Sequence, residues 1–527
     1  MRPAAAIPVI PVEPSGMPRA RAMVERAQWA ARAFATYDID TVRRIVEAAA
    51  RAVAERAPEF AQRAVEETGF GVEKDKVVKN IGCSTGIWET YRGHDYVTPI
   101  ADPDTKVLRI PRPAGVILAL TPSTNPVATA SFKVLLALLT RNTIIVSPHP
   151  YAKSVTADAV RCLAEAAVAA GAPDGCIQVV DEPSIPIIDT LMTDDRVALI
   201  LATGGTPMVR AAYSSGNPAY GVGPGNVPVL VDESADLSRA AARIVESKAF
   251  DHSILCTNES VLIAVDAIAD RLLGHLTREG AHVCSPEETD AIRSLIFSGE
   301  SLRTEWIGRS ASDLATAAGF SVARGTRILL TPIDRVVPEE MLTHEKLLPV
   351  LAFVRVPTAA RGIDAARAVL RVTGAGHSAA IHSEDAETVM AYAAAVRVLR
   401  VCVNVGNSLG GAGFETGLAP TMTIGTGFFG RSSLGANLAP AHLVHLTQAA
   451  WNVDPGVLMP NFEGLNPWQA PTGPRPAYPV ASNLSGVTTP PLTPDGQRSS
   501  SADPAEDDLR AQIRRLVVDE LRAIVRG

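Results

Sequence analysis

Short runs of Val, Ile and Leu alternate with Ala-rich helical stretches along most of this chain. From residue 107 onward the first runs are GVILALTP, TIIVSPHP, CIQVV, VALILATGG and VPVLVDE, and stretches such as SVTADAVRCLAEAAVAAGAPDG separate them. Each run has the length and the turn-residue borders of a buried strand. The alternation predicts an α/β fold with a parallel sheet that is covered by helices on both faces. Such sheets bind ligands beyond the carboxyl ends of the strands, where TPSTNP, SPHP and ATGG stand here.

A second α/β stretch is expected from about Phe250 to Gly430. Its predicted strands are SVLIAV, RILLTP, LLPVLAFVRV, SAAIHS and RVCVNV. Before the first sheet, residues 17–68 carry Ala, Val and Ile at helical spacing with Arg and Glu between them, which is typical of amphipathic helices. After His445 the pattern fades, and ten prolines within residues 455–494 indicate a linker.

Composition and charge argue against nucleic acid and membranes as binding partners. The chain has 527 residues, a formal net charge of -7 and a pI of about 5.9, so it offers no basic face for nucleic acid or for anionic lipid. Prolines interrupt the apolar start MRPAAAIPVIPVEPSG, and Pro122, Asn125, Pro126 and Lys133 interrupt the most apolar later stretch. We therefore expect a cytoplasmic protein with neither a signal peptide nor a membrane span.

Six cysteines are spread through the chain without a CxxC pair and without a His cluster at metal-ligand spacing. This spacing predicts neither a disulfide framework nor a metal site. Most free cysteines are small buried hydrophobic residues, so a nucleophile has to be identified by its neighbours. Cys256 stands out because SKAFDHSILCTNESVLIAV places it where a helix gives way to a strand.

Several motifs share their order with one known family. FDHSILCTNE resembles the nucleophile segment of the aldehyde dehydrogenase superfamily, and ILATGGTPMVRAAYSSGNPAYGVGPGNVPVLVDESAD resembles the matching stretch of its CoA-acylating branch. ETGFGVEKDKVVKN, TPSTNP, SPHP, HEKLLPVLA and LAPTMTIGTGFFG extend the similarity over about residues 17–445. That branch includes the aldehyde half of bifunctional aldehyde-alcohol dehydrogenases and enzymes of bacterial microcompartments.

The resemblance implies a reaction at Cys256. A cysteine thiolate attacks the aldehyde, the resulting thiohemiacetal expels hydride, and a thioester remains. Asn125 matches the amide that, with the N–H of Cys256, holds the developing alkoxide; a turn residue before Pro126 is the alternative. Hydrolytic relatives use a glutamate as the base for water, but YGVGPGNVPVLV contains no acidic residue and Val222 stands at the expected position. The thioester is then expected to pass to coenzyme A, which gives an acyl-CoA.

The same match implies cofactor contacts with NAD and coenzyme A. Glu345 matches the glutamate that binds the nicotinamide ribose, with an ordinary solvated charge as the alternative. The glycines of ATGG leave backbone N–H groups free for a pyrophosphate. SPHP lacks the Lys and Glu that hydrolytic relatives use for the adenosine ribose, which leaves the choice between NAD and NADP open. His377 is a possible active-site residue or a core histidine. The complete predicted cofactor-binding set is Thr121, Pro122, Ser147, His149, Thr203, Gly204, Gly205 and Glu345.

The fold class implied is aldehyde dehydrogenase-like, with a Rossmann-type cofactor domain, an α/β catalytic domain, and a flexible linker and amphipathic helix at the C-terminus. The expected parts are N-terminal helices with the NAD/CoA-binding domain over 17–249, a catalytic domain over 250–430, a return and oligomerisation segment over 431–453, a Pro-rich linker over 454–502 and the helix over 503–527.

The last 25 residues, 503–527, carry an amphipathic helix pattern. Asp503-Pro504-Ala505-Glu506 is a helix start, and apolar residues then recur at spacings of three and four. Such a helix needs a surface on which to dock. One interpretation is that the helix packs on its own enzyme or on another subunit. The other is that it resembles the encapsulation peptides that direct cargo to a microcompartment shell.

The predicted function is oxidation of a short aldehyde, of the acetaldehyde or propionaldehyde class, by a homo-oligomer inside a bacterial microcompartment. One rival is a semialdehyde dehydrogenase for a phosphorylated substrate, which would need Arg or Lys near Cys256. Another is a non-catalytic microcompartment scaffold. Which aldehyde is used stays open, because one methylene in a pocket is worth only about 1 to 3 kcal/mol.

Overall fold

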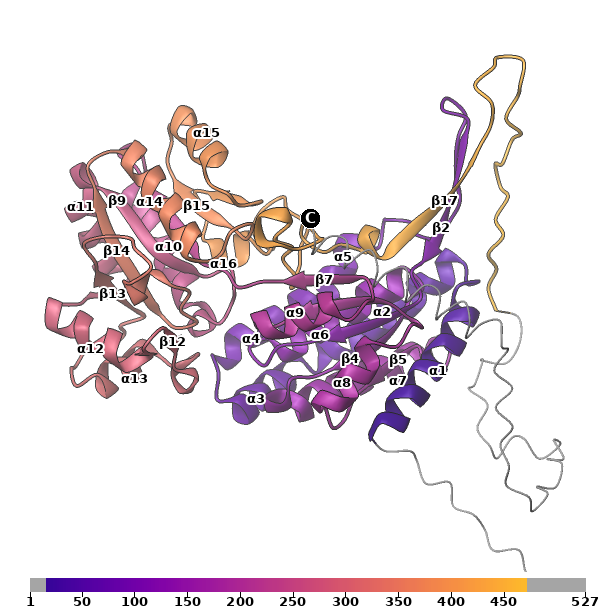
Figure 1. Ribbon diagram of the computed structural model, residues 1–527, viewed down its shortest axis with the longest axis horizontal. Helices are drawn as coiled ribbons and strands as arrows, with labels where there is room; N and C mark the ends of the chain where they lie inside the picture. Colours follow the sequence, from indigo (N-terminus) through magenta and orange to yellow (C-terminus); the bar gives the residue numbers. More distant parts are fainter. Residues whose placement is uncertain (1–15, 472–527) are drawn as a thin grey trace, which may run out of the picture. The chain divides into compact units, whose positions relative to one another are not determined.

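The first sheet confirms the predicted α/β pattern. The computed structural model (Figure 1) describes residues 16–471. It contains a five-stranded parallel sheet in the order β5-β4-β3-β6-β7. Its strands are β3 (Val116–Leu120), β4 (Thr143–Ser147), β5 (Ile177–Val179), β6 (Val197–Thr203) and β7 (Ala219–Val222). The helices that follow or cover them are α6 (Pro126–Leu139), α7 (Lys153–Ala169), α8 (Ile185–Met192) and α9 (Thr206–Ser214).

Both faces of this sheet are buried, as predicted. Along β3, Ile117 and Ala119 belong to a core that also contains α6 and α7, whereas Val116 and Leu118 belong to a core with α8 and α1 (Gly16–Phe34). Alternate residues of a strand point to opposite faces. All five side chains of β3 are buried for this reason, and the reactive chemistry is left to the loops at the strand ends.

Helices fill most of residues 16–91, in agreement with their predicted amphipathic pattern. They are α1, α2 (Ile39–Glu55), α3 (Ala57–Thr68), α4 (Glu73–Ile81) and α5 (Ile87–Tyr91), with a π-helical turn over Gly82–Gly86. The Asp38 side chain caps α2 by accepting from the N–H of Thr41. The apolar face of α2 packs on α6 and α7, so these helices cover the first sheet from outside.

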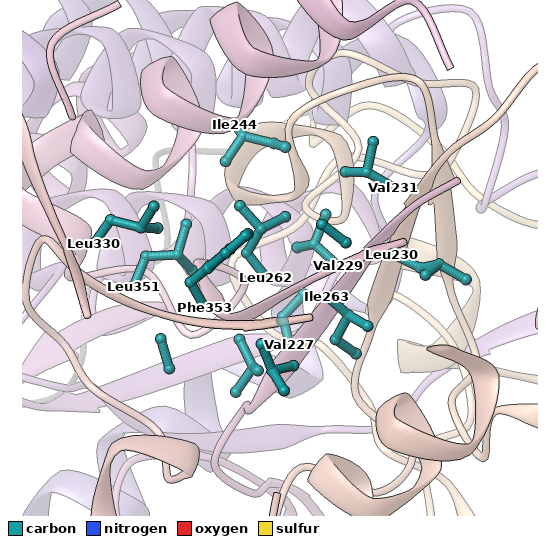
Figure 2. Packing of buried hydrophobic residues seen from close by; sticks show 14 of the residues in the cluster. Val227, Val229, Leu230, Val231, Ile244, Leu262, Ile263, Leu330, Leu351 and Phe353 are labelled. Carbon is teal, nitrogen blue, oxygen red and sulfur yellow. The ribbon is translucent and has the colours of Figure 1, made fainter. Parts of the chain in front are cut away.

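The second sheet is also parallel and has the order β10-β13-β14-β9-β8-β15-β16. Its strands are β8 (Val227–Val231), β9 (Glu259–Val265), β10 (Ala281–Val283), β13 (Ile328–Pro332), β14 (Val350–Val356), β15 (Ala379–His382) and β16 (Val401–Val403). Figure 2 shows its core, in which Val229, Leu262 and Phe353 pack with Ile244 of α10 (Leu237–Ala249).

One strand lies in a different sheet from the one that the sequence suggested. The run VPVLVDE was grouped with the first sheet, but β8 pairs with β9 and β15 of the second. The chain therefore crosses between the sheets within residues 223–226, before α10. Periodicity alone cannot reveal this crossing, because a buried strand looks the same in either sheet.

Six further α-helices and one short antiparallel strand pair accompany the second sheet in the described part of the chain. The helices are α11 (Asp266–Arg278), α12 (Pro286–Ile296), α13 (Ala311–Ala317), α14 (Ala359–Val372), α15 (Ala386–Ala395) and α16 (Asn407–Gly410), and β11 (Phe297–Ser298) pairs with β12 (Ser301–Leu302). Ser285 and Glu288 form a capping box at the start of α12. α14 packs on β8 and β9, which covers the middle of the sheet.

A third, antiparallel sheet was not predicted. It has the order β1-β2-β17 and joins β1 (Ile100–Asp102), β2 (Val107–Pro113) and β17 (Val444–Ala450). β17 falls within the segment expected to serve as a return and oligomerisation region. No helix within residues 16–471 is both long and apolar enough to cross a bilayer.

Candidate active site

Loops at the carboxyl ends of the first sheet's strands, loops that precede β8, β9 and β14 of the second sheet, and the segment after β16 enclose one cavity of about 500 Å³. It gathers ten of the eleven predicted site residues, drawn from segments more than 200 positions apart. Those that line it are Thr121, Pro122, Asn125, Ser147, His149, Thr203, Gly204, Gly205, Cys256 and Glu345. Val222, which the sequence predicted to stand in place of the hydrolytic base, lines the same cavity and is 3% exposed. The structure therefore brings the predicted nucleophile, the amide and the cofactor loops to one place.

Cys256 follows an unusual turn. Asp251, His252 and Ser253 have φ of 47°, 50° and 65°, a left-handed conformation that non-glycine residues rarely adopt. The turn ends α10 and brings Cys256 to the pocket just before β9 begins. Burial raises the pKa of the Cys256 thiol to about 12, and the charge of Glu345 adds to this rise while Arg400 opposes it. The thiol is therefore protonated at neutral pH in this state, and its attack requires loss of that proton.

Asn125 occupies the N-cap position of α6, but its amide is used elsewhere. Nδ2 donates to the carbonyl oxygen of Ile254 at 2.9 Å, and Oδ1 accepts from the ammonium of Lys79. The Asn125 side chain is thus held against Ile254, which lies two residues before Cys256. Asn125 is 7% exposed. This engagement with the nucleophile segment goes beyond what a turn residue before Pro126 would need.

Glu345 lies on a loop before β14 and faces the nucleophile segment. Its Oε1 accepts a hydrogen bond of 3.0 Å from the N–H of Gly225. Burial raises the pKa of Glu345 to about 7, although that hydrogen bond and the charges of Lys248 and Lys346 lower it. A solvated surface charge does not behave this way, since its pKa stays near its ordinary value.

The pocket offers unsatisfied polar groups where a dinucleotide would bind. Gly205 is the N-cap of α9 and has no side chain to cap it, so the first N–H groups of this helix are available to an anion. Ser147 Oγ is buried and has no hydrogen-bond partner among residues 16–471. His149 accepts from the N–H of Tyr151, and burial lowers its pKa. These residues fit a pyrophosphate and a ribose hydroxyl.

His377 is the predicted residue that lies apart from the pocket lining. It is fully buried, and its Nδ1 lies 3.0 Å from Ser378 Oγ. Burial lowers its pKa to about 3, with a further contribution from Arg400, so the ring is neutral at pH 7. Arg400 in turn donates to the carbonyl oxygen of His377 at 3.0 Å. The role of His377 in catalysis stays a prediction.

The apolar wall of the pocket was not singled out from the sequence. Ile188 of α8 and Met208 of α9 contribute to it. The other apolar side chains come from loops, among them Leu255, Leu347, Ala412, Met422 and Ile424. LAPTMTIGTGFFG had been quoted as a family motif, and Thr421, Met422 and Ile424 come from it. Loop residues of this kind carry no periodic pattern, so the family motif was the available signal.

One group of metal-ligand types occurs within the described part of the chain. Donor atoms of His282, Cys284 and Glu288 lie within 4.8 Å of one another, and none of the three lines the pocket. The Glu288 carboxylate already accepts from the N–H of Ser285 and lies 2.9 Å from His282 Nε2. Its oxygens therefore serve the helix cap of α12.

Comparison with known proteins places the chain in a family. Residues 1–417 match the profile of the aldehyde dehydrogenase family, and the chain belongs to that family. It is 37% identical over 430 residues to the bifunctional aldehyde-alcohol dehydrogenase of Escherichia coli K12, covering 80% of this chain and 48% of that protein. It is 35% identical over 431 residues to the acetylating succinate-semialdehyde dehydrogenase of Clostridium kluyveri, covering 81% of this chain and 95% of that enzyme. The chain thus spans about half the length of the bifunctional relative.

Solved structures agree with this assignment. An acetylating aldehyde dehydrogenase from Geobacillus thermoglucosidasius superimposes with a TM-score of 0.82 at 35% identity, over 83% of this chain and 97% of that one. A propionaldehyde dehydrogenase from a fucose-utilisation microcompartment of Clostridium phytofermentans gives 0.75 at 27% identity, over 82% and 97%. The aldehyde dehydrogenase-like α/β fold and the predicted likeness to CoA-acylating members are confirmed. The part of the predicted linker after residue 471 and the predicted helix over 503–527 lie outside the described residues.

Proposed function

We propose that this protein oxidises a short, uncharged aldehyde with NAD and transfers the acyl group from Cys256 to coenzyme A. The observation that carries the proposal is the content of one pocket. Cys256, Asn125 and Glu345 line it together with Val222. By the family resemblance, Val222 is assigned to the position of the base that hydrolytic relatives use. The acetylating relatives described above support the same reaction class.

The first half of the reaction uses Cys256 and Asn125. The Cys256 thiol first releases its proton to solvent water, and the thiolate adds to the aldehyde carbonyl. The new alkoxide accepts hydrogen bonds from Asn125 Nδ2 and from the backbone N–H of Cys256. When NAD is bound, it supplies the acceptor for the hydride that this thiohemiacetal loses. The product left on the protein is a thioester at Cys256, with the same two donors available to its carbonyl oxygen.

The second half of the reaction, acyl transfer, depends on the absence of a base for water among the described pocket residues. Within the described pocket lining, Glu345 is the carboxylate and Val222 is apolar, so water near the thioester has no base at the hydrolytic position. A thiol is intrinsically a better nucleophile than water and attacks a thioester without such help. Acyl transfer to coenzyme A is therefore favoured over hydrolysis.

The cofactors would share one set of contacts. The N-terminus of α9 at Gly204 and Gly205 is suited to a pyrophosphate, and Ser147 Oγ and Glu345 are suited to ribose hydroxyls. Thr121, Pro122 and His149 complete the rim at the ends of β3 and β4. Relatives in solved structures are described with bound NADP⁺ and with bound coenzyme A. NAD is our assignment for this chain.

An uncharged aldehyde suits the wall of this pocket. Its described lining contains no Lys or Arg, and Glu345 would repel an anion. A carboxylate, sulfonate or phosphate on the substrate would lose its hydration without gaining a partner. This argues against a phosphorylated semialdehyde. The complete set of site groups argues against a scaffold without catalysis.

The exposed edge of the third sheet and the microcompartment relative bear on the quaternary structure and the cellular location. Six of the seven residues of β17 are exposed, and β17 is the edge strand of its sheet, which is a surface suited to a second subunit. We infer a homo-oligomer. The microcompartment relative supports a cargo role. The predicted targeting helix, residues 503–527, lies outside the described residues, so shell binding stays a prediction.

A direct assay tests the proposed activity. Purified protein is mixed with propionaldehyde and NAD, and NADH is followed before and after addition of coenzyme A. Sustained NADH formation that starts only with coenzyme A supports the proposal. Sustained NADH formation without it would indicate a hydrolytic enzyme, and none under either condition would support a scaffold.

A further inference from the structure

A buried ion cluster lies behind the amide of Asn125, and no step described so far uses it. Its members are Lys76 and Lys79 of α4 and Asp251 of the left-handed turn before Cys256. Their side chains are 4%, 2% and 0% exposed. Charged groups this deep are costly to bury and need partners, so each contact in the cluster is informative.

Lys79 connects the cluster to the reaction site. Its ammonium contacts both Oδ2 of Asp251 and Oδ1 of Asn125. Asn125 Nδ2 then donates to the carbonyl oxygen of Ile254 at 2.9 Å, two residues before Cys256. A chain of hydrogen bonds thus runs from a buried carboxylate, through an ammonium and an amide, to the nucleophile segment.

Asp251 is fixed from several sides. Its Oδ1 accepts from the N–H of Val72 at 2.6 Å, next to the start of α4, and its own N–H donates to Asp75 at 2.8 Å. Gly71 makes this approach possible, because a Cβ there would lie 2.0 Å from Asp251 Oδ1. Its φ of 78° also favours glycine. The carboxylate that holds Lys79 is therefore itself immobile.

Lys76 provides a comparison within the same cluster. It shares Asp251 at 3.3 Å, but its second bond goes to the backbone carbonyl oxygen of Thr124 at 3.2 Å. Burial and the neighbouring charge of Lys79 lower the pKa of Lys76 to about 8. The two lysines are both buried, lie on the same helix and share the same counter-ion. They differ in that Lys79 contacts the Asn125 side chain.

We propose that Lys79, held by Asp251, is a positioning residue that orients and polarises the amide of Asn125 as an oxyanion donor. A cation at Oδ1 fixes which end of the amide carries the N–H groups, so Nδ2 faces the nucleophile segment. It also draws electron density from the amide and strengthens Nδ2–H as a donor. One of these hydrogens serves Ile254, and the other makes a longer contact of 3.3 Å with Thr124 Oγ1 that an alkoxide can replace. The inference rests on the proposed function, in which Asn125 binds the alkoxide.

A double-mutant cycle tests this coupling. The variants are Lys79→Met, Asn125→Ala and the double variant, assayed with saturating propionaldehyde, NAD and coenzyme A. Asn125→Ala should lower kcat roughly 100- to 1,000-fold, the usual effect of losing one such donor. Lys79→Met should lower kcat about 10- to 100-fold when Asn125 is present, since small misplacements are costly. In the Asn125→Ala background it should change kcat by no more than about twofold.

Further measurements distinguish a loss of Asn125 orientation from a general disruption of the active site. In Lys79→Met, the KM for propionaldehyde, the Kd for NAD and the rate of Cys256 alkylation by iodoacetamide should stay within about twofold of wild type. A loosened nucleophile turn would change the alkylation rate. Lys79→Gln, which retains an N–H donor near Oδ1, should recover part of the lost kcat. Lys76→Met is the matched control and should lower kcat by the same factor in both backgrounds.

Two results would overturn the inference while leaving the proposed function intact. Either Lys79→Met leaves kcat unchanged although Asn125→Ala lowers it, or Lys79→Met costs the same factor in both backgrounds. Full kcat in Asn125→Ala would overturn the oxyanion role and the inference together. If Lys79→Met does not fold, the cycle is run with Lys79→Gln, and the same comparison of factors decides.

Discussion

The backbone N–H of Gly225 donates a 3.0 Å hydrogen bond to Oε1 of Glu345, which ties the predicted cofactor-binding carboxylate to the crossing between the two sheets. Gly225 also passes so close to the nucleophile segment that a Cβ would lie 1.9 Å from the carbonyl oxygen of Cys256. The Glu345 carboxylate and the backbone of Cys256 thus both lie next to Gly225. The charge of Glu345 consequently adds to burial in raising the pKa of the Cys256 thiol.

The buried Glu345 carboxyl should make the free energy of unfolding decrease as the pH rises. Burial raises the pKa of Glu345 from 4.5 to about 7, so the folded state binds this proton more tightly than the unfolded state does. Its contribution to stability is present below pH 4.5 and is lost as the pH rises to about 7. Glu345→Gln removes this loss, so the Tm of the variant minus that of wild type should increase between pH 5 and pH 8. A difference that stays constant, measured by calorimetry across that range, would contradict the assignment.

A base introduced at Val222 should open the hydrolytic route. Val222 lines the pocket with Cys256 and is 3% exposed, so a carboxyl there would have a raised pKa and could act as a base near neutral pH. Val222→Glu should form NADH from propionaldehyde without coenzyme A, at the expense of acyl-CoA. Val222→Gln has a similar size without a base and should not. Equal rates in the two folded variants would mean that the missing base does not decide the outcome.

Anionic aldehydes should be poor substrates. Because no Lys or Arg lines the described pocket, a substrate carboxylate would be buried without a partner. We expect kcat/KM for succinate semialdehyde to be at least about 100-fold below that for propionaldehyde, in steady-state assays with NAD and coenzyme A. Comparable values for the two aldehydes would show that a cation reaches the substrate from elsewhere.

Removal of residues 503–527 should separate catalysis from location. The truncated enzyme is expected to keep its turnover in solution, because the predicted site residues lie between positions 121 and 377. In cells that assemble microcompartments, it should no longer co-purify with the shells. Continued co-purification, or loss of folding on truncation, would mean that the tail serves the enzyme itself.

The strands and their carboxyl ends could be predicted from the sequence because buried parallel strands read as short apolar runs. TPSTNP, SPHP and ATGG were placed at strand ends, and their residues do line one pocket. Within residues 16–471, seven strands were missed, namely β1, β2, β7, β10, β11, β12 and β17. β17 has six exposed residues out of seven and therefore lacks the apolar pattern of a buried strand.

The buried contacts of the site could not be predicted in the same way. The motif ETGFGVEKDKVVKN contains Lys76 and Lys79, but lysines in an amphipathic helix normally point to solvent. Only the fold brings them to Asp251, which lies 172 positions after Lys79. The assignment of β8 to the second sheet likewise depends on long-range pairing. Such relationships leave no local periodicity in the sequence.

The proposed reaction requires the acyl group to pass from Cys256 to coenzyme A. A single-turnover experiment with propionaldehyde and excess NAD, without coenzyme A, tests it most directly. We expect about one NADH per active site and one propionyl group on the peptide that contains Cys256, by mass spectrometry. Coenzyme A should then remove that group as propionyl-CoA, and Cys256→Ala should bind NAD but give neither signal. Steady NADH formation without an adduct, or an adduct on another cysteine, would contradict this account.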